Sequence, residues 1–169
     1  MTLEEQNAVL SAEYAEANRY MDNAKETLKK TEKRDDGYYR DAKYVRSACG
    51  IAYLGVLVAV EVWLALKGVS ASGKKKKSID YYTFNVAQLD KKMLDYLNTA
   101  YNVLHLDGYY RGETRVKAIE VGFDAAYDII DKIKPENPVI VPETRGGKAK
   151  RAWNTMLISA ATMFMRNRF

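Results

Sequence analysis

Apolar residues recur every three or four positions along most of the chain, the spacing that gathers them on one face of a helix. The first segment opens with Thr2 and Glu5, a pair typical of a capping box, in which each side chain accepts a hydrogen bond from the other's backbone N–H. An apolar stripe follows at steps of four and three: Leu10, Tyr14, Ala17, Met21, Ala24 and Leu28. These features predict a first amphipathic helix that runs to about Lys33.

The next segment, from about Tyr39 to Lys67, is apolar on all sides, as is typical of a buried helix. One face carries only small residues, which let a neighbouring helix approach closely: Ala48, Ala52, Gly55 and Ala59. The run from Ile51 to Leu66 is shorter than the roughly 20 residues of a membrane span, and Glu61 interrupts it. We therefore expect a central buried helix rather than a membrane span.

A loop with four consecutive lysines, residues 68–78, separates this segment from two further amphipathic patterns. Apolar positions from Tyr82 to Leu104 predict a third helix. Those from Val116 to Ile133 predict a fourth helix, which ends before Pro135 because proline cannot continue a helix. Together the four helices make up a predicted bundle domain, residues 1–134.

The pentapeptide DGYYR occurs twice, at 36–40 and at 107–111, and each copy is expected to end one helix and start the next. The first two helices then resemble the next two. This repeat predicts an all-α, up-down bundle of four long helices arranged as two hairpins. In that interpretation the motif is a joint, with glycine in the turn and tyrosine rings over the bundle end.

A second interpretation makes the two copies a nucleotide or RNA site, because aromatic rings stack bases and cations hold phosphates. The residues of this site are Tyr38, Tyr39, Arg40, Tyr109, Tyr110 and Arg111, with the lysine run Lys74, Lys75, Lys76 and Lys77. Base stacking requires exposed rings, so exposure decides between the joint and the platform.

The chain continues with a predicted linker, residues 135–151, that holds all three prolines, and with a C-terminal amphipathic helix, residues 152–169. One face of that helix is apolar and carries Trp153, Met156, Leu157 and Phe164. Burying such side chains stabilises by about 1.5–3 kcal/mol each, so another surface is expected to cover them. Three surfaces are available: the chain's own bundle, the bundle of a second copy, and an acidic lipid surface. We expect a homodimer in which this tail helix contributes to the interface.

Composition adds two constraints. The net charge of +5 permits an acidic partner but is far below that of an obligate nucleic-acid binder. The single cysteine, Cys49, excludes an internal disulfide and suits the cytoplasm. We expect no secretion signal, because the first residues lack a basic region followed by an apolar one.

Catalytic and metal-binding patterns are sparse. The one histidine, His105, is expected at a helix end, and a lone histidine is a weak acid–base signal. His105 and Cys49 do not make a zinc site at their spacing, so no metal or cofactor is expected. Glu61 interrupts an apolar helix, where a carboxylate needs a bonded partner. It is either such a structural partner or a pocket carboxylate with a raised pKa.

Four stretches carry a resemblance to a bacterial family of short all-helical proteins of unknown function. They are DGYYRDAKYVRSACGIAYLGVLVAVEVWL, KKKKSIDYY, LDKKMLDYLNTAYNVLHLDGYYRG and VGFDAAYDIID. The resemblance spans roughly residues 7–134. In layout the family is similar to HEPN bundles, many of which are ribonucleases with an arginine four to six residues before a histidine. Thr99, Ala100 and Tyr101 stand at those distances before His105, so the resemblance does not extend to the nuclease.

The sequence therefore predicts a non-enzymatic, cytoplasmic interaction or oligomerisation protein. A nucleotide or RNA binder that uses the tyrosine, arginine and lysine clusters is the alternative. An enzyme centred on Glu61 is the third hypothesis.

Overall fold

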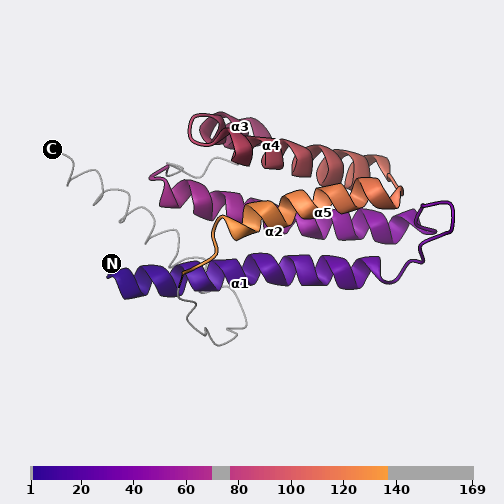
Figure 1. The fold of residues 1–169 in the computed structure, drawn as a ribbon, viewed down its shortest axis with the longest axis horizontal. Helices are drawn as coiled ribbons and strands as arrows, with labels where there is room; N and C mark the ends of the chain where they lie inside the picture. Colours follow the sequence, from indigo (N-terminus) through magenta and orange to yellow (C-terminus); the bar gives the residue numbers. More distant parts are fainter. Residues whose placement is uncertain (1, 70–76, 137–169) are drawn as a thin grey trace.

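The computed structural model describes residues 2–69 and 77–136, and the structural statements below concern these residues. They form an all-α bundle, as predicted, and their only extended pairings are two isolated bridges. The elements are α1 (Leu3–Leu28), α2 (Ala42–Leu66), α3 (Ile79–Ala87), α4 (Lys91–Ala100), the π-helix η1 (Tyr101–Arg111) and α5 (Val116–Asp131). In Figure 1, α1 lies along one edge, α3 and α4 lie along the other, and α2 and α5 run between them.

Helix α1 begins at the predicted capping box. The Thr2 backbone N–H donates to Glu5 Oε2 over 2.8 Å, and the Glu5 N–H donates to Thr2 Oγ1 over 3.2 Å. The helix ends at Leu28, earlier than predicted, and the chain then bends so that the residues before and after Gly37 run antiparallel. The middle of the apolar stripe, Ala17, Met21 and Ala24, is fully buried.

Helix α2 is the centre of the bundle and packs against α1, η1 and α5. Its small ridge faces α1: a Cβ on Gly55 would lie 3.0 Å from Tyr20 Cβ and 3.1 Å from the Ala17 carbonyl oxygen. Within the described chain, α2 is one helix that is long and apolar enough to cross a membrane. However, 56% of its most apolar window is buried inside the protein, and core helices of helical bundles reach the same length and hydropathy.

The prediction of one continuous third helix is wrong. The helix is divided into α3 and α4, because Asp90 starts a new helix: its Oδ1 accepts the Met93 N–H over 3.0 Å. Beyond Ala100 the chain does not end its helix but continues as an eleven-residue π-helix. Most π-helical segments are single-turn bulges, so this one is unusually long.

The second DGYYR is consequently not a turn. Residues 107–111 form the end of η1, and the chain turns afterwards at Gly112, which has φ +78°. Only the first copy is a joint, with Gly37 at φ +84°. The two glycines differ in what they do: a Cβ on Gly108 would overlap Cys49 Sγ, so Gly108 permits close packing of η1 on α2. The prediction that both copies are helix-entry joints holds for the first only.

The two copies nevertheless meet at one end of the bundle. The Tyr39 N–H donates to the Thr114 carbonyl over 2.8 Å, and the Val116 N–H donates to the Gly37 carbonyl over 2.9 Å. These bonds tie the connection between α1 and α2 to the connection between η1 and α5.

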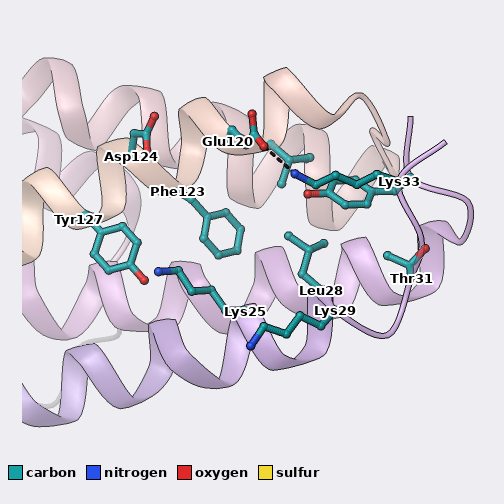
Figure 2. A pocket seen from close by; sticks show the side chains of 11 residues that line it. Lys25, Leu28, Lys29, Thr31, Lys33, Glu120, Phe123, Asp124 and Tyr127 are labelled. Atoms are coloured by element: carbon teal, nitrogen blue, oxygen red, sulfur yellow. Dashed lines mark hydrogen bonds and ion pairs between the residues drawn. The ribbon is translucent and has the colours of Figure 1, made fainter. Parts of the chain in front are cut away.

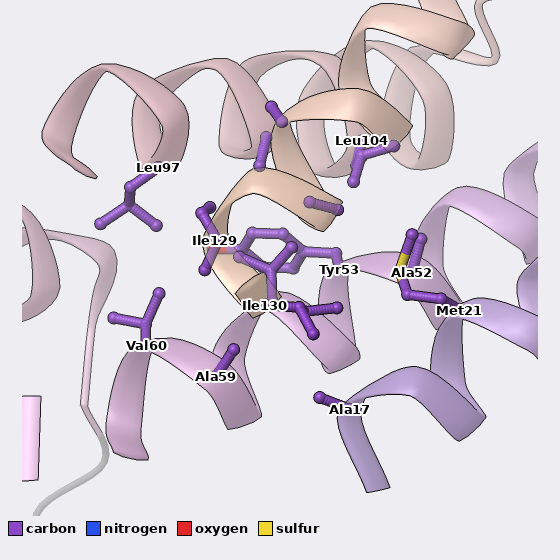
Figure 3. Close-up of a cluster of buried hydrophobic side chains, with 14 of the residues drawn as sticks. Ala17, Met21, Ala52, Tyr53, Ala59, Val60, Leu97, Leu104, Ile129 and Ile130 are labelled. Carbon is purple, nitrogen blue, oxygen red and sulfur yellow. The ribbon is translucent and has the colours of Figure 1, made fainter. Parts of the chain in front are cut away.

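The core is continuous between the helices, and Figure 3 shows side chains from several of them converging on α2. Met21, Leu97, Leu104 and Ile129 are fully buried there. The predicted tail helix, with Trp153, Met156, Leu157 and Phe164, and most of the linker lie outside the described residues.

We predict that Gly55→Leu destabilises the protein by at least about 1–3 kcal/mol, because even a Cβ at this position meets α1. Asn98→Leu adds the same side chain on the exposed side of α4 and should change stability by less than about 0.5 kcal/mol. Urea unfolding of both variants measures the difference, and equal midpoints for Gly55→Leu and the parent would contradict the close approach of α1 and α2.

Candidate functional site

Glu61 is a bonded carboxylate. Its Oε1 accepts a hydrogen bond from the Tyr82 hydroxyl over 2.5 Å, and its Oε2 lies 3.2 Å from Lys77 Nζ. The Tyr82 ring is only 4% exposed, and burial together with the bond to Glu61 raises the pKa of Tyr82. Glu61 therefore links α2 to α3, and it is not among the residues that line the groove described below.

In the first tyrosine–arginine cluster, only one of the two tyrosine rings is exposed enough to stack a base. Tyr39 is 4% exposed, so its faces are not open to a base, whereas Tyr38 is partly exposed. Arg40 pairs with Glu32, with 3.0 Å between Arg40 Nε and Glu32 Oε2. These contacts do not favour a nucleic-acid site at the first copy.

The second cluster has open rings and a paired arginine. Tyr110 is 73% exposed and Tyr109 is also exposed. Arg111 Nη1 lies 2.6 Å from Asp107 Oδ1, so this arginine is paired with a carboxylate where a phosphate would have to bind. Of the lysine run, Lys74, Lys75 and Lys76 lie outside the described residues. Lys77 is paired with Glu61.

His105 lies in the middle of η1 rather than at a helix end, in a row of stacked rings. Its ring centroid is 5.3 Å from that of Tyr101 and 6.0 Å from that of Tyr109, both nearly parallel to it. Tyr53 of α2 closes the row at 4.9 Å from His105. The nearby Asp107 is paired with Arg111, so this geometry supplies no acid–base pair with His105.

Sequence reasoning missed this row, although its signal is present. Tyr101, His105 and Tyr109 follow one another at steps of four, and a four-residue step places side chains on one side of a helix. The small Gly50 of α2 makes room for the row, since a Cβ there would lie 3.1 Å from Tyr109 Cδ2.

The candidate functional site is the face of α2 that the neighbouring helices leave partly exposed. We call it the outer face, and its apolar members are Gly50, Ile51, Leu54, Leu57 and Val58. Leu54, at its centre, is 48% exposed, while the other four are half-buried. The ring row of η1 lies beside this face through Gly50, so apolar helix and aromatic rings form one continuous surface.

Charged residues lie near the two ends of the outer face. Lys43 and the exposed Arg46 precede Gly50 on this side of the helix, and Arg46 donates hydrogen bonds to the Tyr109 and Tyr110 carbonyl oxygens. Glu61 follows Val58 at the other end. The Ser47 hydroxyl, which also lies on this side of the helix, donates a hydrogen bond to the Lys43 carbonyl oxygen over 3.0 Å, so the hydroxyl has its partner within the helix. The middle of the face therefore presents no group that needs water.

A second concave feature is a groove of about 510 Å³ between the C-terminal half of α1 and α5. Figure 2 shows Lys25 and Lys29 on α1, Lys33 on the following loop, and Phe123 pointing from α5 into the gap. This groove was not predicted from the sequence.

Within residues 2–69 and 77–136, no group of three metal-ligating side chains comes together. Cys49 is fully buried, and burial raises the pKa of its thiol to about 12, so it is a packing residue at neutral pH rather than a nucleophile.

Most of the chain matches a known protein family. Residues 12–135 match the model of a domain of unknown function, DUF5618. The chain belongs to the DUF5618 family. A search of curated proteins gave no match to this DUF5618 chain.

Among solved structures, the DUF5618 chain is similar to a protein of unknown function from Dyadobacter fermentans. The two sequences are 35% identical, the TM-score is 0.63, and the similarity covers 73% of this chain and 94% of the other. The bundle is therefore shared with a bacterial protein of unknown function.

We predict that Tyr82→Phe destabilises the DUF5618 protein by about 1.5–3 kcal/mol at pH 7, because Glu61 loses a hydrogen bond to its charged form. The folded state raises the pKa of Tyr82 above its ordinary value of 10.0, so above pH 10 the parent has a loss of stability that the variant lacks. The other tyrosines with a raised pKa, such as Tyr53, are present in both proteins. Denaturant unfolding from pH 7 to pH 11 should show the difference between the two proteins shrinking. A constant difference would contradict this link.

Proposed function

We propose that this DUF5618 protein is a non-enzymatic interaction module that forms a homodimer through the outer face of α2. The observation that supports it is Leu54, a large apolar side chain that is 48% exposed in the middle of the central helix. Single exposed leucines are ordinary, but this one lies among four half-buried apolar positions and beside a row of rings.

The chemistry of the surface favours a protein partner. Tyrosine is enriched among the residues that contribute most to protein interfaces, and apolar centres with charged rims are their usual arrangement. The outer face has an apolar centre, tyrosines at its side, and charges at its ends.

A second copy of the chain fits this face in sequence register. Two antiparallel α2 helices related by a two-fold axis near Ala52 place Leu54 of each level with Gly50 of the other, where it can pack on the Tyr109 ring that lies against Gly50. The same register brings Lys43 opposite the partner's Glu61, about 27 Å from the matching pair at the other end. A two-fold interface requires this self-complementarity.

We predict that the parent chain has twice the chain mass in solution and that Leu54→Arg converts it to monomer. An arginine at the centre would be buried without a partner charge in the dimer. Val121→Arg is the matched control, because Val121 is an exposed apolar residue of α5 away from the outer face. Light scattering coupled to size exclusion measures all three masses.

A monomeric parent would refute the homodimer, and a dimer unaffected by Leu54→Arg would place the interface elsewhere. Binding of the parent to lipid vesicles, lost in Leu54→Arg, would instead assign the outer face to a membrane surface. The predicted role of the tail is tested with a chain ending at Glu136, which should remain dimeric but dissociate more readily if the tail contributes.

The register gives a separate prediction. Lys43→Glu places a carboxylate opposite the partner's Glu61 at both ends of the interface. The two carboxylates repel each other, so the dissociation constant of the dimer should rise in low salt. High salt screens this repulsion and should restore the dimer. Lys117→Glu changes the net charge equally on exposed α5 and should leave the dimer unchanged. Sedimentation velocity over a concentration series measures the dissociation constants of both variants and of the parent. Equal dissociation constants for Lys43→Glu and the parent in low salt would contradict the register.

The remaining parts of the proposal are a HEPN-like arrangement of the bundle and a cytoplasmic location, the latter supported by the single buried thiol of Cys49. The RNA-binding alternative has less support, because Tyr39 is buried and Arg40 and Arg111 are paired. The enzyme hypothesis has less support because both Glu61 oxygens are bonded.

A further inference from the structure

The groove between α1 and α5 has the composition of a small-molecule site. Its volume of about 510 Å³ falls in the range of ligand pockets, about 300–1,000 Å³. Its walls are mainly apolar, and three of its residues carry aromatic rings: Tyr39, Phe123 and Tyr127. Phe123 is nearly buried and points into the gap between the two helices (Figure 2).

The polar groups that reach the groove are mostly donors. Lys25, Lys29 and Lys33 stand at steps of four along one side. Lys25 has no carboxylate partner among the described residues. Its ammonium lies 4.4 Å from the centroid of the Tyr127 ring. Lys29 pairs with Glu26 of its own helix, where both side chains are well exposed and the attraction is weak.

Tyr39 brings a hydroxyl to the groove. The residue lines the groove and is 4% exposed, and among the described residues no side-chain oxygen is both buried and without a hydrogen-bond partner, so this hydroxyl is reached by solvent. A ligand in the groove can therefore replace water as the partner of the hydroxyl.

The acidic residues of the groove do not cancel this arrangement. Glu120 is bonded to Lys33 over 2.9 Å and so closes one end. Asp124 points away from α1 in Figure 2. Lys25, Lys29 and the Tyr39 hydroxyl remain as donors around an apolar, ring-lined interior.

We infer that the groove binds a small organic anion: a flat, apolar ring system with one carboxylate or phosphate. The ring system lies against Phe123, where aromatic rings pack edge to face or offset. The anionic group accepts hydrogen bonds from Lys25 and Lys29, with Tyr39 as the neutral donor. This binding is independent of the proposed dimer, because the groove and the outer face share no residue.

The test uses the full chain and naphthalene-2-carboxylate as the probe, with isothermal titration calorimetry. Naphthalene-2-methanol has the same rings without the charge, and acetate has the charge without the rings. We expect the carboxylate to bind at least about tenfold more tightly than the alcohol, the ratio that one charge-assisted hydrogen bond gives, and acetate not to bind.

Two variants locate the site. Lys25→Gln removes the unpaired ammonium and should weaken naphthalene-2-carboxylate about tenfold, while Lys117→Gln, an exposed lysine of α5 outside the groove, should leave binding unchanged. Tyr39→Phe keeps the ring and should weaken binding several-fold. The monomeric variant Leu54→Arg should bind as the parent does, which separates this inference from the dimer.

Three results overturn the inference: equal affinity for the carboxylate and the alcohol, parent-like affinity in Lys25→Gln, or no binding of naphthalene-2-carboxylate at millimolar concentration. Acetate binding as tightly as the naphthalene probe would also overturn it, because the lysines would then attract any small anion without using the groove.

Discussion

The bundle depends on the close approach of two helices to α2, one at each of two glycines. Gly55 lets α1 approach so closely that a single added carbon would stand 3.0 Å from Tyr20 Cβ. Gly108 lets η1 approach so closely that an added carbon would overlap Cys49 Sγ. Dispersion between closely packed atoms is individually small and collectively large, and close-packed interiors respond to even one extra methylene. These two contacts set how closely α1 and η1 lie against α2.

Close packing on these sides leaves α2 one face that is only partly covered. With α1, η1 and α5 covering the rest, the outer face from Gly50 to Val58 is apolar yet partly exposed, although the helix has the composition of a core element. An apolar helix in a closed bundle is buried on all sides. Leu54 departs from that rule, and this departure is the observation on which the proposed interface rests.

Local sequence predicted the parts of the fold that local interactions determine. The capping box at Thr2, the stripe around Met21 and the small ridge around Gly55 depend on spacing within one helix, and the structure shows each of them. The conformation of the repeated DGYYR does not follow from the motif itself: Gly37 lies in a turn with positive φ, whereas Gly108 lies within η1 and packs against Cys49. Likewise, the groove combines residues of α1 and α5 that are about ninety positions apart, and no local pattern brings Lys25 to Tyr127.

The same close contacts bear on whether the groove and the outer face influence each other. The groove is walled by α1 and α5, which touch each other little and are held mainly through α2 and, for α5, also α4 and η1. For a ligand in the groove to alter the outer face, α2 would have to shift against α1 or η1. The contacts at Gly55 and Gly108 leave no space for such a shift. Two sites are coupled when an element between them has two conformations and a ligand at either site binds one conformation more tightly than the other. Since the packing allows α2 one arrangement, occupancy of one surface should leave the affinity of the other unchanged.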